Sequence, residues 1–260
     1  MSKNYQLAII GSGSGGRAAS VFAARNGLRT ALIERDKIWG TCFHSGCYAV
    51  LALQASAREF RDRWRSGRFG NRVELFRETL RDWLRTQSNV SSRLVDDLRT
   101  ELEQSGIDLY HGYGQFRDER TIQIADPSGT TKTIVADNTI VATGSRARFA
   151  NNLAPRLVNS DQLLRIQSLP ERLVIIGAGY IGCEFASIYR TLGCAVTIIE
   201  QANRILPGWE PEAGELVRQA LEMRGVSVQI HARFRSNKSN NMRKAFAFPD
   251  PEKRPLKLTV

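Results

Sequence analysis

Residues 7–16 read LAIIGSGSGG, and this stretch decides the fold of the first part of the chain. The apolar run before Gly11 predicts a buried strand, and the glycine spacing that follows is typical of a turn that opens a helix. Gly11 permits the tight turn, Gly13 lets the backbone approach a pyrophosphate, and Gly16 lets helix and strand pack closely. The next apolar run ends at Glu34, whose carboxylate can accept hydrogen bonds from a ribose. The stretch therefore predicts a dinucleotide-binding unit.

The same pattern returns 166 residues later, where residues 173–182 read LVIIGAGYIG. Gly177, Gly179 and Gly182 occupy the three glycine positions, and Glu200 follows Gly177 by 23 residues, the interval seen in the first copy. One such glycine pattern is weak evidence, since glycine-rich turns also occur in α/β sheets that bind nothing. Two copies, each with its strand, helix and terminal acid, predict an α/β fold with two Rossmann-like units and parallel sheets.

Glu200 also bears on the choice of nucleotide. A carboxylate at this position accepts hydrogen bonds from a free ribose 2′-hydroxyl and repels a 2′-phosphate, which favours NAD over NADP. Arg204 lies four residues further on and could still assist a phosphate.

A cysteine pair follows the first unit, in residues 39–47, which read WGTCFHSGC. Cys42 and Cys47 could form a structural disulfide, half of a metal site or a redox couple. A zinc site requires four ligands and no second pair stands nearby in the sequence, which disfavours metal. We expect Cys183 and Cys194 to be small buried residues.

The composition indicates a protein without a nucleic-acid or membrane partner. The net charge is +11, but the last 26 residues hold seven Lys and Arg against two acids, so solvated surface and a basic tail account for the excess. No nucleic-acid recognition motif, signal peptide or apolar run long enough to span a bilayer is visible. We therefore expect a cytoplasmic location.

The remaining periodicity predicts a helical excursion and a small antiparallel hairpin between the two units. Helices are expected at 49–65 and 74–103, a strand at 107–115, a hairpin around 127–129 and a short buried strand at 138–144. We divide the chain into a first domain over 1–150, an incomplete second domain over 151–234, and a basic tail without regular structure over 235–260.

These motifs, in this order, resemble the pyridine nucleotide–disulfide oxidoreductases. The likeness covers residues 5–234 and includes Gly-Thr-Cys-x4-Cys at 40–47 and Ala-Thr-Gly-Ser at 142–145. The segment 200–207, EQANRILP, is most similar to the NAD-dependent dihydrolipoamide dehydrogenase branch, and mercuric reductases are also similar. The resemblance implies a flavoprotein with a role in cell redox homeostasis that acts on a small, lipoamide-like disulfide.

The resemblance also implies a role for each matching residue. Cys42 would exchange with the substrate disulfide and Cys47 would face the flavin, which makes this pair the catalytic redox couple. The residues implied to bind FAD are Gly11, Gly13, Gly16, Glu34, Gly40, Thr41, Gly114, Thr143, Gly144 and Ser145. Those implied to bind NAD are Gly177, Gly179, Tyr180, Ile181, Gly182 and Glu200.

The chain also departs from the family pattern. Leu51 stands where the family has a lysine that pairs with the acid corresponding to Glu184. The resemblance implies a homodimer with a C-terminal dimerisation domain that supplies an acid/base pair, and we expect this chain to be a truncated form without that domain. The abrupt change near Phe234 indicates a truncated or frameshifted reading frame. The alternative to an enzyme is therefore a truncated, non-catalytic nucleotide-binding remnant.

Overall fold

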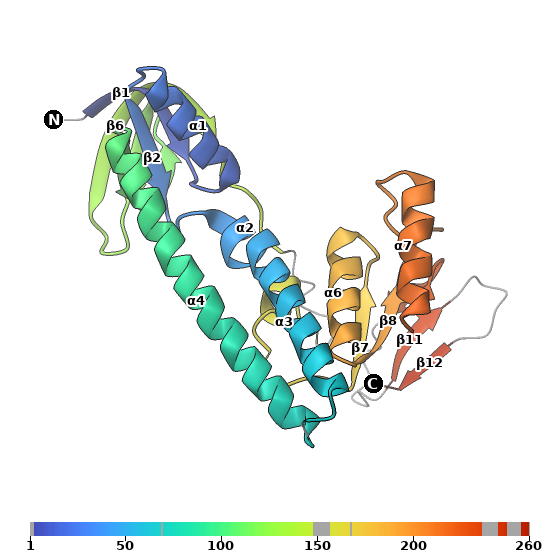
Figure 1. Ribbon diagram of the computed structural model, residues 1–260. Coiled ribbons are helices and arrows are strands. Elements are labelled where there is room, and N and C mark those ends of the chain that lie inside the picture. The colour runs from blue at the N-terminus through green and yellow to red at the C-terminus, as the bar shows by residue number, and fades with distance from the viewer. Residues whose placement is uncertain are drawn as a thin grey trace. The chain divides into compact units, whose positions relative to one another are not determined.

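The chain forms two compact units in the computed structural model (Figure 1). The structure describes residues 3–68, 70–147, 157–166, 168–235, 244–248 and 256–259. The first unit consists of residues 1–51 and 84–147, and the second consists of residues 52–83 and 148–260. Both are α/β structures, which confirms the predicted fold class. The assignment of one cofactor to each domain stays a prediction.

A six-stranded sheet forms the first unit, with the strand order β3-β2-β1-β6-β5-β4. The first four strands in this order are parallel, whereas β5 pairs antiparallel with both of its neighbours. The strands are β1 (Lys3–Ile10), β2 (Thr30–Glu34), β3 (Asp108–His111), β4 (Tyr113–Phe116), β5 (Thr121–Ala125) and β6 (Thr131–Val141). The antiparallel pair β5–β6 confirms the predicted hairpin.

Side chains of residues 7–10 on β1 alternate between two apolar clusters, one on each face of the sheet. Leu7 and Ile9 pack with residues of α1 (Ser14–Arg25) and with Leu98 and Leu102 of α4 (Arg72–Gln104). Ala8 and Ile10 point the other way and pack with residues of β2, β5 and β6. The sheet is therefore covered on both faces, and the parallel strands align their carboxyl ends at one edge.

Two strand predictions were wrong in detail. The strand expected at 107–115 is two strands, because Gly112 between β3 and β4 has a φ of 156° and lies against the Ala125 carbonyl. The strand expected at 138–144 is the end of β6. It is exposed rather than buried, and Val141 is 61% exposed. The pairing with β5 extends only to Val135, where β5 begins, so among the described strands only β1 pairs with this end of β6.

The helical excursion is confirmed. It consists of α2 (Gly40–His44), α3 (Cys47–Arg65) and the single long helix α4, with the predicted break between α3 and α4. On α4, Leu75, Trp83, Leu98 and Leu102 are buried, whereas Leu84 is exposed. None of the described helices is long and apolar enough to cross a membrane.

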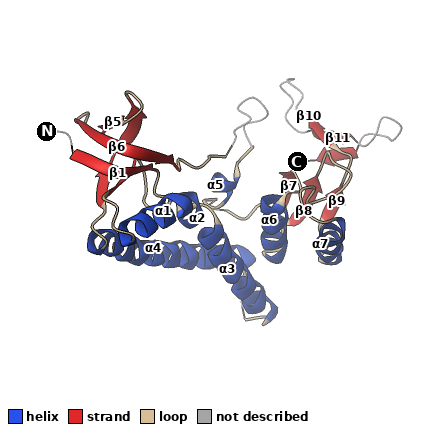
Figure 2. Ribbon diagram, turned by 90° about the horizontal axis from the view of Figure 1, so that it is seen from above, coloured by secondary structure: helices blue, strands red, loops and turns tan. Residues whose placement is uncertain are grey.

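The core of the second unit is a parallel sheet with the strand order β7-β8-β9. Its elements are β7 (Arg172–Ile176), α6 (Tyr180–Thr191), β8 (Ala195–Ile199), α7 (Pro211–Met223) and β9 (Ser227–Gln229). Because both strand–helix–strand crossovers run in the same direction along the sheet, α6 and α7 lie on one face of it (Figure 2).

A small antiparallel sheet follows, with the order β10-β11-β12. Its strands are β10 (Arg233–Arg235), β11 (Lys244–Phe248) and β12 (Leu256–Thr259). The expectation of no regular structure after residue 235 is therefore wrong for β11 and β12. The alternating residues in KAFAF and LKLT are typical of strands. The prediction was wrong because it followed the basic, proline-containing composition of the surrounding residues.

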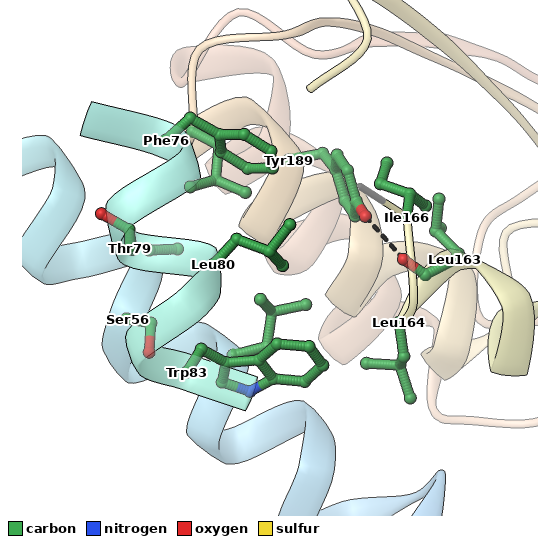
Figure 3. A pocket seen from close by; sticks show the side chains of 12 residues that line it. Ser56, Phe76, Thr79, Leu80, Trp83, Leu163, Leu164, Ile166 and Tyr189 are labelled. Carbon is green, nitrogen blue, oxygen red and sulfur yellow. Dashed lines mark hydrogen bonds between the residues drawn. The ribbon is translucent and has the colours of Figure 1, made fainter. Parts of the chain in front are cut away.

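An apolar cavity lies within the second unit, lined by α3, α4, α6 and α5 (Ser160–Leu163) (Figure 3). Leu80, Trp83 and Leu164 line it, and the Tyr189 hydroxyl donates a hydrogen bond of 2.8 Å to the Leu163 carbonyl beside it. The free space is about 10 Å³, which holds one water at most. This region is packed core and is too small for a nucleotide or a substrate.

Candidate functional site

The first glycine turn joins β1 to α1 at the carboxyl edge of the parallel strands. Gly11 has a φ of 106°, and its amide donates a hydrogen bond of 2.7 Å to the Ile33 carbonyl on β2. Gly13 is the N-cap of α1. A Cβ on Gly16 would stand 1.8 Å from the Gly11 carbonyl oxygen, so helix and turn can pack this closely only around a glycine.

The second glycine turn repeats this geometry between β7 and α6. Gly177 has a φ of 99°, and its amide donates a hydrogen bond of 2.8 Å to the Ile199 carbonyl on β8. Gly179 is the N-cap of α6, and a Cβ on Gly182 would stand 2.2 Å from the Gly177 carbonyl oxygen. The two turns therefore share the same φ region at the first glycine, the same backbone hydrogen bond and the same close approach at the third glycine.

Each turn is held by the acid that ends its second strand. One Glu34 carboxylate oxygen accepts hydrogen bonds from the Ser12 amide (2.8 Å) and hydroxyl (2.7 Å), and the other accepts from the Asp36 amide (2.8 Å). Glu200 accepts from the Ala178 and Ala202 amides at 2.7 and 2.8 Å. Both acids are buried at the turn, where a ribose of a bound dinucleotide would lie.

The surroundings of Glu34 also change its acidity. Burial raises the pKa of this carboxyl, but the hydrogen bonds from Asp36 and Ser12 outweigh burial and hold the pKa below its ordinary value. The group is therefore an anion at neutral pH and can act only as an acceptor.

The amino termini of α1 and α6 are suited to bind a phosphate. Neither has a side-chain cap or an acid in its first turn among the described residues, and a Cβ on Gly13 or Gly179 would meet no atom within 4 Å. By contrast, Asn159 caps α5, and α7 has Glu212 in its first turn. The uncapped amides and the helix dipole of α1 and α6 match the charge and shape of a pyrophosphate.

Among the other predicted residues of the first site, Gly40 and Thr143 contact this turn. A Cβ on Gly40 would stand 3.0 Å from the Gly13 Cα, and a Cβ on Gly11 would meet Ala142 and Thr143. Thr41, Thr143, Gly144 and Ser145 are exposed around this point. Gly114 lies apart on β4, where it packs against the side chains of Ile10 and Ile33.

The two cysteines lie in the first unit, on the consecutive helices α2 and α3. Cys42 is on α2 and is half-buried, whereas Cys47 begins α3 and is exposed. A Cβ on Gly46 would stand 2.9 Å from both the Cys42 Cα and the Thr41 carbonyl oxygen. Gly46 thus permits the close packing of α2 against the start of α3, a role that was not predicted from the sequence.

Trp39 is the other residue that the sequence analysis missed. Its φ is 80°, which costs a bulky L-residue about 1–2 kcal/mol. Its indole N–H donates a hydrogen bond of 3.0 Å to the Leu94 carbonyl, worth about 0.5–1.5 kcal/mol. The Arg17 guanidinium lies 4.5 Å from the ring centroid, which adds about 0.5–1 kcal/mol. These contacts are large enough to offset the backbone strain.

The other cysteines and His44 behave as local structural groups. Burial raises the pKa of Cys183 and of Cys194 to about 11, so both stay protonated at neutral pH. The His44 Nε2 lies 2.8 Å from the Ile38 carbonyl oxygen, a local hydrogen bond next to the cysteine pair. No group of three or more metal-ligating side chains occurs in the part of the chain that the structure describes.

In the second unit, the residues around the glycine turn leave its outer side open. Tyr180 and Ile181 are 61% and 44% exposed. The Arg204 guanidinium donates hydrogen bonds to the carbonyls of Trp209 (2.7 Å) and Pro207 (2.8 Å), which hold it within its own loop.

Two matched glycine turns with buried acids define the class of α/β proteins with two Rossmann-like units, and in this chain a cysteine pair lies beside the first turn. Residues 5–255 match the family model described as pyridine nucleotide-disulphide oxidoreductase, and the chain belongs to this family. The match extends past Phe234, the residue at which the likeness was predicted to end.

Similar proteins agree with this family. The chain is 32% identical to dihydrolipoyl dehydrogenase 2, chloroplastic, of Arabidopsis thaliana over 224 residues, which are 84% of this chain and 39% of that one. It is 34% identical to a dihydrolipoyl dehydrogenase of Bacillus subtilis (strain 168) over 234 residues, 87% of this chain and 50% of the relative. The chain thus spans about half the length of these relatives or less.

The fold is also similar to solved structures. The HOCl-induced flavoprotein disulfide reductase RclA from Escherichia coli superposes with a TM-score of 0.75 at 25% identity, over 97% of this chain and 54% of that one. LpdA from Mycobacterium tuberculosis has a TM-score of 0.79 at 23% identity, over 98% and 56% of the two chains, and supports the fold alone.

Proposed function

We propose that this chain carries the nucleotide-binding and redox-active part of an FAD-dependent, NAD(H)-linked disulfide oxidoreductase. The first unit binds FAD, the second binds NAD(H), and Cys42 and Cys47 form the redox couple. The observation that carries the proposal is the contact between Gly40 and Gly13, because it joins the cysteine segment to the first glycine turn within one unit.

The residues of the first turn fit the ADP part of FAD. The open space at Gly13 and the uncapped amides of α1 receive the pyrophosphate, while the anionic Glu34 accepts from a ribose hydroxyl. Gly40 and Thr41 stand next to the same turn and line the site. A bound flavin supplies two-electron exchange between a nicotinamide and a neighbouring disulfide.

The thiol pair performs disulfide exchange with the substrate. The Cys42 thiolate attacks one sulfur of the substrate disulfide and forms a mixed disulfide, and the first substrate thiolate leaves and takes up a proton. The Cys47 thiolate then attacks the Cys42 sulfur and releases the second substrate thiol. The substrate disulfide gains two electrons and two protons, and the cysteine pair becomes the disulfide. In the opposite direction the same steps oxidise a dithiol.

NAD(H) is the preferred nucleotide of the second unit in this proposal. Glu200 is buried at the turn and would repel a 2′-phosphate. Arg204, the nearby cation that could have assisted a phosphate, is engaged with two carbonyls of its own loop. Both observations favour a ribose with a free 2′-hydroxyl.

The names of the similar proteins support a small disulfide as the substrate. Two are dihydrolipoyl dehydrogenases and one is a flavoprotein disulfide reductase. We therefore take lipoamide, a cyclic disulfide, as the first compound to test.

Purification tests the proposal directly. The protein is purified, supplied with FAD, and its flavin content is measured by absorbance. We expect a yellow protein whose flavin absorbance bleaches with NADH and recovers with lipoamide. A colourless protein that takes up no FAD would contradict the proposal and favour a non-catalytic remnant.

Nucleotide preference is tested on the same sample. Flavin bleaching is titrated with NADH and with NADPH, and NADH is expected to act at a concentration at least about tenfold lower, the size of one 1.4 kcal/mol contact. Arg204→Met is the matched control: because Arg204 is held within its loop, the preference should stay unchanged. A preference of the unaltered chain for NADPH would overturn the role given to Glu200.

A further inference from the structure

Trp39 has a backbone conformation that its side chain disfavours, directly before the cysteine segment. Its φ of 80° and ψ of −12° lie in the left-handed region, and it is the N-cap residue of α2, which carries Cys42. A bulky residue keeps such a conformation only where its surroundings determine it, and such residues cluster at functional sites.

Two elements of the first unit hold the Trp39 side chain. The indole N–H bonds the Leu94 carbonyl on α4, and the Arg17 guanidinium of α1 lies over the ring at 4.5 Å. Arg17 is itself ion-paired with Glu101 of α4. The ring is therefore fixed by a cation whose own position is fixed by a carboxylate.

From Trp39 a row of aromatic rings runs along the cysteine segment. The Trp39 and Phe43 centroids are 5.8 Å apart, and those of Phe43 and Tyr48 are 5.4 Å apart. Phe43 is 3% exposed and follows Cys42, while Tyr48 follows Cys47. Each redox cysteine is thus directly bonded to a residue of this row.

We infer that Arg17 and Trp39 are positioning residues for the redox couple: the stacked pair sets the conformation of the cysteine segment and so how readily Cys42 and Cys47 close into a disulfide. The inference rests on the proposed function, in which these thiols form the couple. Neither residue touches substrate in this account, since both act through the backbone of Gly40 and through the aromatic row.

The equilibrium between dithiol and disulfide tests the inference without a bound flavin. The full chain is equilibrated with mixtures of reduced and oxidised glutathione, one oxidised glutathione being consumed and two glutathione thiols released per disulfide formed. Thiols are then trapped by alkylation, and the Cys42–Cys47 disulfide is quantified by peptide mass spectrometry. The measured quantity is the equilibrium constant for disulfide formation.

Trp39→Gly suits the left-handed backbone but removes the ring, and Arg17→Met removes the cation but keeps the side-chain length. We expect each to lower this constant about tenfold, equivalent to about 30 mV for a two-electron couple. Together they should lower it no further than either alone, since they act as one unit. Trp39→Phe keeps a ring under the guanidinium and should restore part of the loss.

Arg25→Met is the matched control, because Arg25 also faces Glu101, at 3.7 Å, and makes no described contact with Trp39. It should leave the constant unchanged. Unaltered constants in folded Trp39→Gly and Arg17→Met would overturn the inference, as would an equal change in Arg25→Met. If circular dichroism shows that Trp39→Gly is unfolded, the equilibrium constant of Arg17→Met alone tests the inference. Failure of the unaltered chain to form the disulfide would instead refute the redox couple itself.

Discussion

The Cβ that an alanine would place at Gly16 would stand 1.8 Å from the carbonyl oxygen of Gly11. The atom that it would meet belongs to the backbone of the turn, which cannot move aside as a flexible side chain can. The first helix therefore packs against the glycine turn only with glycine at this position.

Gly16→Ala should accordingly destabilise the first unit, by about 3 kcal/mol, the upper end of the range for overpacking. The measurement is the free energy of unfolding from urea titration. Gly15→Ala is the control, because a Cβ there meets no atom within 4 Å, and it should change stability by less than about 1 kcal/mol. Equal effects of the two substitutions would show that the close approach is not rigid.

The hydrogen bonds to Glu34 should make stability depend on pH. Because the folded pKa of this carboxyl lies below its unfolded value, the unfolded chain takes up the proton first as the pH falls. The stabilisation is complete above the unfolded pKa of about 4.3 and is lost as the pH falls through the folded pKa. In thermal unfolding, Glu34→Gln should therefore lose less stability between neutral and acidic pH than the unaltered chain. The exposed Glu119→Gln should follow the unaltered chain, and a parallel curve for Glu34→Gln would contradict the role of these hydrogen bonds.

The four cysteines should differ in reactivity. With their pKa at about 11, Cys183 and Cys194 are thiolate in only roughly one molecule in a thousand at pH 8, and both are buried. The exposed Cys47 and the half-buried Cys42 should be alkylated by iodoacetamide well before them in the reduced protein. Peptide mass spectrometry over time gives the order, with a denatured sample as the control in which all four react. Fast alkylation of Cys194 in the folded chain would contradict its buried position.

The Tyr189 hydroxyl should contribute to the stability of the second unit. Tyr189→Phe would leave the Leu163 carbonyl without this donor beside a closed apolar cavity, at a cost of about 1–3 kcal/mol in the free energy of unfolding. Tyr113→Phe, at a side chain 55% exposed, should have little effect in the same urea titration. A neutral Tyr189→Phe would mean that another donor replaces the hydroxyl.

The glycine turns could be predicted from sequence because their geometry depends on few residues, all close along the chain. A positive φ at Gly11 and the approach of Gly16 each require glycine, and the carboxylate of Glu34 closes the turn at a fixed interval. The roles of these residues toward FAD and NAD stay predictions.

Other features could not be predicted because they depend on contacts between distant segments. Nothing in the local sequence indicates a left-handed Trp39, since tryptophan disfavours that conformation and the contacts that hold it come from Arg17 and Leu94. Gly112 lies between two segments whose sequence is typical of a single strand. The strand is interrupted there because of the contact with the Ala125 carbonyl, which comes from a distant segment. Composition likewise misled the prediction for residues 244–248 and 256–259.

The Ser12 hydroxyl is one difference between the carboxylate clusters of the two turns. Its hydroxyl gives Glu34 an extra hydrogen bond, whereas Ala178 at the matching position has no hydroxyl to offer Glu200. Glu34 is consequently the more preorganised acceptor, and a preorganised group loses less conformational entropy when a ligand arrives. Under the proposed function, this extra hydrogen bond predicts that a dinucleotide dissociates more slowly from the first turn than from the second.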